Sequence, residues 1–341
     1  MPLTLEKLCQ ELNLSYSGNG ELVIRQVCGL NKLMPGGVVF INVASDLAEI
    51  PSSSEIGVVV PVGTKSSDHN LIYAADPLAL HVEITRYLHP SSEISKTIHP
   101  TAVIGKNVVL GKNVTLDAHV VLYDNVKVGA NSILHAGVVV MHQCTIGENC
   151  LIYPNVTIRE DCWVGDRVII HSGSVIGSDG YGYFQRNKEH HKIPQIGNVI
   201  LEDDVEIGGC CAIDRSRFYS TILGQGTKLD NLVHIAHNVE VGAHSLLTAQ
   251  VGIAGSTKAG HHLVMGGQSG IVDQVEVGNE VTILSRGLIS KNTKDHTVVG
   301  GAPARPAKKW KHLQALFNRL DTLFARVKRL EKLVERDSAS D

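Results

Sequence analysis

Aromatic residues are scarce in this chain: Phe, Trp and Tyr make up only 4% of its 341 residues. Glycine is abundant by contrast, with 33 residues. β-Branched residues prefer strands and glycine permits sharp turns, so a chain rich in Val, Ile and Gly favours many short strands joined by tight corners. The length allows two or three structural units with an ample core.

A strong charge of either sign is also missing. The formal net charge is −3, and charged residues make up 19% of the chain. A nearly neutral balance argues against a nucleic-acid-binding protein, although the C-terminal end is locally basic.

The seven cysteines are odd in number and form no Cys-x-x-Cys pair. This argues against a disulfide framework or a zinc site, and we expect no metal. Cys144, Cys150 and Cys162 are separated by multiples of six residues. We interpret them as small apolar side chains that fill a stacked row.

Long apolar runs are absent as well. The N-terminus does not show the basic start and long apolar stretch of a secretory signal. No segment approaches the roughly 18 uncharged apolar residues that span a bilayer. We therefore expect a soluble, cytoplasmic protein without a transmembrane segment.

A period of six residues is the strongest pattern in the chain. Every sixth residue from Ile98 to Ile176 is aliphatic, and the row returns between Leu201 and Ile289. Neither a helix nor a simple strand produces such a row. Hexapeptide repeats wind a parallel β-helix, with three hexads in each triangular coil. The predicted fold class is therefore mainly β: a left-handed parallel β-helix of roughly ten coils, with the aliphatic row pointing inward.

Residues 178–198 break the period and predict a loop that leaves the β-helix. A regular rod is a scaffold, so we expect its loops to carry function.

The segments on either side of the repeat lack the hexad pattern. We predict an α/β domain at residues 1–97, the β-helix at 98–302 and a helical extension at 303–341. In the first domain, Asp76-Pro77 predicts a helix start and residues 58–60 a buried strand. In the last, apolar residues recur at spacings of three and four, a coiled-coil pattern: Leu313, Leu316, Leu320, Leu323, Val327, Leu330 and Val334. Three such helices could meet on a threefold axis; the alternative is one amphipathic helix folded back on its own subunit.

Four segments carry a resemblance to a known family: residues 192–197, 203–208, 213–215 and 230–239. They closely resemble the UDP-3-O-acylglucosamine N-acyltransferases of lipid A biosynthesis, in the hexapeptide-repeat superfamily. The Ile-Ala-His-Asn stretch at 235–238 is the most specific part. The resemblance implies a uridine-binding N-terminal domain and transfer of an (R)-3-hydroxyacyl group from acyl carrier protein to the 2-amine of UDP-3-O-acyl-glucosamine. It also implies a homotrimer with active sites in the grooves between neighbouring β-helices, and no cofactor beyond the phosphopantetheine arm of the donor.

His237 is the candidate base. A sugar ammonium must lose a proton before its amine attacks a thioester, and histidine suits this task near neutral pH. The resemblance assigns the role to His237; the alternative is an ordinary surface histidine, since the chain has 17. Asp230 and Asn231 would bind substrate by the same resemblance, and the alternative for Asp230 is a hydrogen bond at a corner of the coil.

Gly255 follows His237 by 18 residues, which is the length of one coil. It should therefore lie almost directly above His237, about 4.8 Å away. Because glycine has no Cβ, a thioester could approach the backbone N–H, which would serve as an oxyanion donor. The competing interpretation is a glycine that only turns a corner.

Two positions depart from the family pattern. Gln274 stands where the family has a second histidine, and an amide cannot carry a proton or a positive charge. By the same resemblance, Phe40 is expected to contact uracil, but the tyrosine that usually follows it in the family is missing from this sequence. The chain is therefore interpreted as a divergent or second copy of the enzyme. By resemblance, Leu288 limits the acyl length; the alternative is packing between subunits.

Lys308, Lys309 and Lys311 form the basic stretch that we expect to dock the acidic carrier protein. The alternative is a solvated helix face.

Two other functions remain open: another nucleotide-sugar N-acyltransferase on the same scaffold, or a β-helix binding protein that has lost catalysis.

Overall fold

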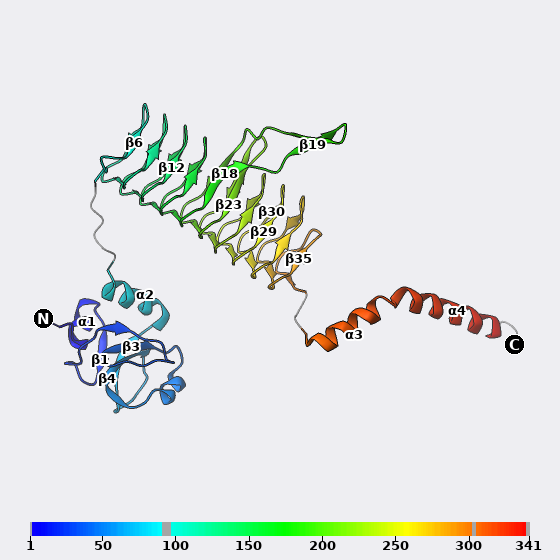
Figure 1. Cartoon of the computed structure of the whole chain (residues 1–341). Helices are drawn as coiled ribbons and strands as arrows, with labels where there is room; N and C mark the ends of the chain where they lie inside the picture. The colour runs from blue at the N-terminus through cyan, green and yellow to red at the C-terminus, as the bar shows by residue number, and fades with distance from the viewer. Residues whose placement is uncertain (1, 91–96, 302–304, 339–341) are drawn as a thin grey trace. The chain divides into compact units, whose positions relative to one another are not determined.

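The computed structural model describes residues 2–90, 97–301 and 305–338 (Figure 1). The chain divides into two compact units, Met1–Ile94 and Ser95–Asp341. The predicted boundary after residue 302 lies outside the described residues.

The first unit is a small α/β domain. Its sheet has the order β1-β5-β4-β3-β2, with only β1 antiparallel to its neighbour. Asp76 accepts hydrogen bonds from the backbone N–H groups of Leu78 and Ala79, which confirms the predicted helix start. The predicted strand at 58–60 lies within β4. The elements are α1 (Leu5–Glu11), β1 (Ser15–Ser17), β2 (Gln26–Val27), β3 (Gly37–Phe40), the 3₁₀ helix η1 (Ala44–Glu49), β4 (Ser53–Pro61), β5 (His69–Ala74) and α2 (Pro77–Leu88).

The second unit contains the predicted parallel β-helix, which the stacked short strands of Figure 1 confirm. Its three faces are parallel sheets, here called face 1, face 2 and face 3. Face 1 comprises β7 (Val109–Leu110), β10 (Lys127–Val128), β13 (Thr145–Ile146), β16 (Trp163–Val164), β21 (Asn198–Leu201), β24 (Ser220–Leu223), β27 (Glu240–Val241), β30 (Lys258–Ala259) and β33 (Glu276–Val277).

Face 2 and face 3 each contain ten strands, in agreement with roughly ten coils. Face 2 comprises β8 (Thr115–Leu116), β11 (Ile133–Leu134), β14 (Leu151–Ile152), β17 (Ile169–Ile170), β22 (Glu206–Ile207), β25 (Lys228–Leu229), β28 (Leu246–Leu247), β31 (Val264–Met265), β34 (Thr282–Ile283) and β36 (Val298–Val299). Face 3 comprises β6 (Val103–Ile104), β9 (Val121–Leu122), β12 (Val139–Val140), β15 (Thr157–Ile158), β18 (Val175–Asp179), β23 (Ala212–Arg215), β26 (His234–Ile235), β29 (Gly252–Ile253), β32 (Gly270–Ile271) and β35 (Leu288–Ile289).

The aliphatic row fills the interior of this stack. Leu134, Ile152 and Ile170 are fully buried, one above another on successive rungs. The row starts differently from our expectation, because Ile98 and Ile104 are 48% and 42% exposed. They belong to the first coil, which has a neighbouring coil on one side only.

Asparagine explains how the corners form. Many corner residues have a positive φ, for example Asn107 (57°), Asn125 (62°) and Asn149 (56°). Asparagine tolerates this left-handed conformation better than most residues with a side chain. Its amides also stack between coils, since Asn107 Nδ2 donates to Asn125 Oδ1 at 3.2 Å.

The interior cysteines behave as predicted. Cys144, Cys150 and Cys162 are at most 1% exposed. Burial raises the pKa of the Cys144 thiol to about 12 and those of Cys150 and Cys162 to about 11. These neutral thiols serve as small apolar side chains in the core.

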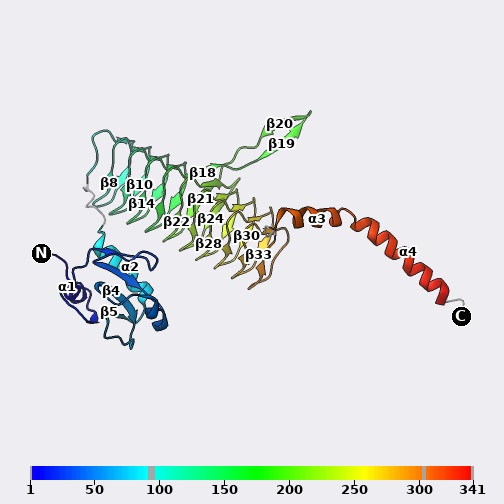
Figure 2. The ribbon, with the colours of Figure 1, turned by 60° about the horizontal axis from the view of Figure 1, so that its bottom comes forward.

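The predicted loop is a hairpin that extends away from the stack (Figure 2). It consists of β19 (Tyr183–Arg186) and β20 (Glu189–Lys192), which pair antiparallel. The hairpin begins at the end of β18, where the pairing with β23 shifts register between Ile176 and Ser178.

The C-terminal extension is helical, as predicted, but it is broken into α3 (Ala307–Phe317) and α4 (Leu320–Ser338). The heptad pattern continues across the break, where Asn318 ends α3. The seam residues Leu316, Leu320 and Leu323 are exposed. None of the described helices is long and apolar enough to cross a membrane.

Candidate active site

A groove of about 610 Å³ lies on face 3 of the β-helix. Four of the residues predicted for the site lie in it: His237, Gly255, Gln274 and Leu288. They come from four successive coils, so the six-residue repeat is what aligns them.

His237 lies just beyond β26 and is half-buried between two glycines. A Cβ atom at Gly255 would lie only 2.9 Å from Nε2 of His237, and one at Gly180 only 2.5 Å from its Cβ. Any larger residue at either position would therefore displace the ring. Gly255 was expected here from the coil length. Gly180 was not, because it belongs to the segment that breaks the repeat.

Asn238 orients the imidazole of His237. The Oδ1 atom of Asn238 accepts a hydrogen bond from the backbone N–H of Arg217 at 3.2 Å, and it lies 3.1 Å from Nδ1 of His237. Because this oxygen is an acceptor, Nδ1 carries the proton and donates it. Nε2 is then the unprotonated nitrogen, available to take a proton next to Gly255.

The backbone around Gly255 leaves one donor available. The N–H of Ser256 donates to the carbonyl oxygen of His237 at 2.9 Å, which links the two coils. Within the described part of the chain, the N–H of Gly255 donates to no acceptor. An oxyanion that forms next to His237 could accept this hydrogen bond.

One column of face 3 forms a bare channel beside His237. His234, Gly252, Gly270 and Leu288 occupy equivalent positions on four successive rungs. A Cβ at Gly252 would meet nothing within 4 Å, whereas one at Gly270 would lie 3.4 Å from Cδ1 of Leu288. The channel thus has a polar end at His234, two rungs without side chains and an apolar end at Leu288.

Gln274 lies at the edge of the same groove and is exposed. Its backbone N–H donates to the carbonyl oxygen of Gly255 at 3.0 Å, and its side chain donates to Asp273 at 3.3 Å. The residue is therefore near His237, but its amide hydrogen-bonds to a neighbouring carboxylate.

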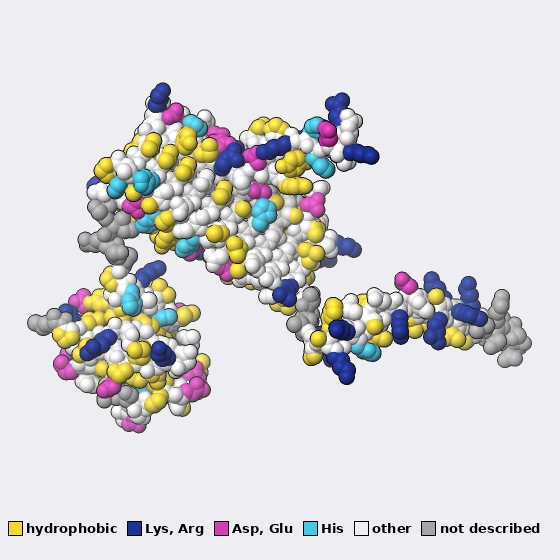
Figure 3. Space-filling view, viewed as in Figure 1, with side chains coloured by type: hydrophobic (Ala, Val, Ile, Leu, Met, Phe, Trp, Pro, Cys, Tyr) yellow, Lys and Arg dark blue, Asp and Glu magenta, His cyan; other side chains and the backbone are white. Residues whose placement is uncertain are grey.

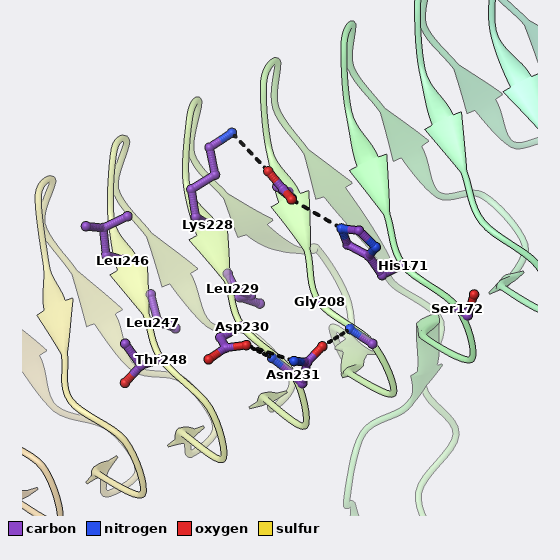
Figure 4. Close-up of a pocket in the computed structure, with 12 residues that line it drawn as sticks. His171, Ser172, Gly208, Lys228, Leu229, Asp230, Asn231, Leu246, Leu247 and Thr248 are labelled. Carbon is purple, nitrogen blue, oxygen red and sulfur yellow. Dashed lines mark hydrogen bonds and ion pairs between the residues drawn. The ribbon is translucent and has the colours of Figure 1, made fainter. Parts of the chain in front are cut away.

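Asp230 and Asn231 lie elsewhere, in a second pocket of about 670 Å³ at face 2 (Figure 4). Asp230 Oδ1 accepts a hydrogen bond from the Asn231 backbone at 2.7 Å, and Asn231 Oδ1 accepts one from the Gly209 backbone at 2.7 Å. These are corner hydrogen bonds. Asp230 follows β25 and His237 follows β26, so successive corners of the coil separate the two side chains within one chain.

Charged side chains line the wall of the second pocket. His171 Nε2 lies 3.2 Å from the Glu206 carboxylate, and Lys228 Nζ donates to the carbonyl oxygen of Asp204 at 2.6 Å. Leu246, Leu247 and Thr248 complete the pocket on the other side. A ligand with both polar and apolar parts would suit this lining.

Two buried charged residues beneath the groove were not predicted to have a role. Asp214 is 7% exposed, and its Oδ2 atom lies 3.6 Å from Nε2 of His234. Burial raises the pKa of the Asp214 carboxyl, while its hydrogen bond with Ser178 and the nearby His234 and His237 oppose this effect. Arg215 is 3% exposed. The family resemblance at residues 213–215 included this pair, but it assigned no role to either residue.

The remaining predicted residues lie outside the groove. In the first unit, the Phe40 ring lies 4.4 Å from the ring of His81. On α3, Lys308, Lys309 and Lys311 are all exposed. Figure 3 shows that α3 and α4 carry many basic side chains.

The chain is similar to several known proteins. The family model described as bacterial transferase hexapeptide (six repeats) matches residues 107–142 and 143–178. A protein of Methylacidiphilum infernorum named UDP-3-O-acylglucosamine N-acyltransferase is 46% identical over 94% of this chain and 92% of its own length. A Coxiella burnetii protein of the same name is 36% identical over 97% of this chain and 98% of its own length. A solved structure of an Arabidopsis UDP-N-acetylglucosamine acyltransferase covers 60% of this chain and 71% of its own at 22% identity, with a TM-score of 0.49.

Proposed function

Because this chain belongs to the UDP-3-O-acylglucosamine N-acyltransferase family, we propose that it transfers an (R)-3-hydroxyacyl group to the 2-amine of UDP-3-O-acyl-glucosamine. The donor in this proposal is acyl carrier protein, whose phosphopantetheine arm carries the acyl group as a thioester. The product would be a diacylated precursor of lipid A. The observation that carries the proposal is the ring of His237, held between Gly180 and Gly255 in an open groove.

His237 is the base in this proposal. Its Nε2 atom takes the proton from the sugar amine as the nitrogen attacks the thioester carbon. A C–N bond forms, and the carbonyl becomes an oxyanion that the N–H of Gly255 stabilises. When the C–S bond breaks, the imidazolium returns the proton to the sulfur of the leaving thiolate. An amide and a free thiol result, so no proton is gained or lost overall.

The acyl chain occupies the bare channel. A chain that starts at His237 can run over Gly252 and Gly270, which have no side chain to obstruct it. It would then meet Leu288, three rungs or about 14 Å along the channel from the coil that carries His237. This supports the role of Leu288 as the limit on acyl length.

The sugar nucleotide requires a second wall. Asp230 and Asn231 line a pocket on face 2, whereas His237 lies on face 3. We place the reaction between two subunits of a homotrimer, where face 2 of one chain meets face 3 of the next. The sugar would then contact Asp230 of one chain while its amine lies near His237 of the other.

An assay of N-acylation tests the proposal directly. The chain is supplied with a 3-hydroxyacyl carrier protein and UDP-3-O-acyl-glucosamine, and amide formation is measured by mass spectrometry. His237→Ala should reduce turnover by at least about 100-fold, the usual scale for a lost general base. Folding should persist, because the ring contributes little to the core. Nearly normal turnover in this variant would refute the assignment of the base, and no amide with the unmodified chain would refute the function.

A further inference from the structure

His234 and Asp214 form a pair beside the base that the mechanism above does not use. His234 is on β26 and lines the same groove as His237, with 53% of its side chain exposed. Asp214 lies on the neighbouring strand β23, one rung below. A buried carboxylate is costly unless it has partners, so its position under an open groove calls for an explanation.

The two carboxylate oxygens of Asp214 contact residues on two different strands, β18 and β26. Oδ1 accepts a hydrogen bond from the Ser178 hydroxyl at 2.7 Å, at the root of the hairpin. Oδ2 faces Nε2 of His234 at 3.6 Å. The carboxylate therefore lies beside Nε2 of His234 and favours a proton on that nitrogen, as carboxylates near a functional histidine commonly do.

The other ring nitrogen of His234 is available to a ligand. In the described part of the chain, Nδ1 of His234 has no hydrogen-bond partner. A neutral ring can accept a hydrogen bond at this atom and a protonated ring can donate one. A hydroxyl group is a matching ligand in either state, because it both donates and accepts.

The position of His234 specifies which hydroxyl. It begins the column that continues over Gly252 and Gly270 to Leu288. The acyl donor also has a polar end and an apolar end. Its thioester and 3-hydroxyl lie two carbons apart at one end, and an alkyl tail follows. With the thioester carbon at His237, the 3-hydroxyl reaches the polar end of the channel and the tail reaches Leu288.

We propose that His234, positioned by Asp214, recognises the 3-hydroxyl group of the acyl donor. The inference rests on the proposed function, since it assigns part of the same groove. His234 contacts the substrate, whereas Asp214 acts through His234 and is a positioning residue. Gln274 does not serve this role, because it lies on the adjoining column above Ser256 and its amide donates to Asp273.

The test compares two carrier-protein donors of equal chain length, one with the 3-hydroxyl and one without it. The kcat/KM ratio for the two donors is measured for the unmodified chain and for His234→Ala. The variant should lose at least about tenfold more activity with the hydroxylated donor than with the other, because a lost hydrogen bond to a bound hydroxyl costs that much or more. His234→Gln should restore part of the ratio, since an amide also bonds to a hydroxyl.

Asp214→Asn keeps the size of the side chain and removes its charge. It should lower the same ratio by a smaller factor while leaving the KM for the UDP-sugar unchanged. Leu288→Gly is the matched control, because it lies in the same column and should change the chain-length preference without changing the hydroxyl ratio. Circular dichroism confirms that each variant is folded.

The outcomes are distinct. An unchanged ratio in His234→Ala, or an equal loss with both donors, would overturn the inference. If the unmodified chain acylates the sugar with neither donor, the proposed function itself fails. If the unmodified chain transfers both donors equally well, it does not recognise the 3-hydroxyl, and the inference about His234 is wrong.

Discussion

Glu160 forms ion pairs with two arginines, Arg159 and Arg215. Its carboxylate lies 2.8 Å from Nη1 of the buried Arg215 and 2.9 Å from Nη2 of Arg159. Burial alone would raise the pKa of Glu160, but the Arg159 hydrogen bond and the Arg215 charge lower it to about 2 from an ordinary 4.5. The charged form is therefore favoured by the folded chain, and Arg215 in turn holds the root of the hairpin through the carbonyl oxygen of Gly177.

This lowered pKa predicts a pH-dependent stability. A carboxyl with a lower pKa in the folded state adds stability above its unfolded pKa, and that contribution is lost as the pH falls from about 4.5 to about 2. Glu160→Gln should reduce the free energy of unfolding at pH 7 by about 2–3 kcal/mol, and at pH 3 by about half of that or less. Urea denaturation at both pH values measures the difference. Glu189→Gln, an exposed change on the hairpin, is the control; an equal loss at both pH values for Glu160→Gln would contradict the assignment.

Leu288 gives a second prediction at the scale of one residue. Its side chain is 66% exposed and stands at the end of the glycine column. Leu288→Gly should extend the preferred acyl chain by a few carbons, because the obstacle to the chain end is removed. Competition among carrier proteins with different acyl lengths measures this preference. Val109→Gly removes a similarly exposed apolar side chain from face 1, 57% exposed, and should leave the preference unchanged. An unchanged acyl-length profile for Leu288→Gly would place the limit elsewhere.

Single residues also show how far the sequence could predict the site. Gly255 could be placed beside His237 because an unbroken coil puts residues 18 apart in contact. Gly180 and Asp214 could not, because the hairpin interrupts the period and the pairing of β18 with β23 shifts register there. The contacts of Asp214 therefore depend on tertiary structure, and nothing in the hexad row indicates which strand covers it.

The element α3 carries the charges expected to guide the carrier protein. Lys308, Lys309 and Lys311 are exposed within its first turns, and Figure 3 shows basic side chains along the helices. Charges at the rim of an interface mainly speed encounter with an opposite charge, and salt weakens them. Changing all three lysines to Glu should raise the KM for acyl carrier protein by about tenfold or more, with little change in turnover at saturation.

A second triple variant separates docking from net charge. Lys106, Lys112 and Lys127 are exposed on the first coils of the β-helix, far along the sequence from α3. Changing them to Glu gives the same net charge but should leave the KM for the carrier protein nearly unchanged. Equal effects in the two variants, or a KM that does not depend on salt, would show that α3 is not the docking element.

The elements differ in how well their patterns predicted them. The hexad row predicted the three sheets, because each inward aliphatic residue has an identical environment on the next coil. The apolar seam from Leu313 to Val334 predicted a helix but not its break, since the heptad spacing continues across Asn318 and Arg319. The exposure of the aliphatic residues in the first coil was also not predicted. The six-residue period shows which residues point inward, but it does not show that this coil has a neighbour on one side only.

For the whole molecule, the proposed function predicts an assembly. Asp230 and His237 lie at successive corners of the coil and line different pockets, so the proposed site takes its second wall from another chain. A closed trimer supplies that wall three times, and the exposed seam of α3 and α4 is available to hold the chains together. Sedimentation should give three times the 36.7 kDa of one chain, and a monomer at micromolar concentration would contradict this arrangement.

Mixed trimers give a stricter test of the shared site. If each groove takes Asp230 from one chain and His237 from another, a trimer made of either variant alone lacks one of the two residues in every groove. Asp230→Ala and His237→Ala should therefore each be inactive when expressed alone. Co-expression should restore activity, because about a quarter of the grooves then combine an intact Asp230 with an intact His237 from different chains. No recovery above the two separate variants would show that both residues act within one chain.

The bare channel ends on β35, which is the outermost strand of face 3. In a stack where each coil contacts only its neighbours, the outermost coils open at the lowest free energy. His237 and Gly255 lie on rungs with a neighbour on each side, whereas Leu288 has one on a single side. On warming, the end of the channel should therefore loosen before the reacting groups lose their alignment. The selection for acyl length would then vary with temperature over a range in which the rate of transfer persists.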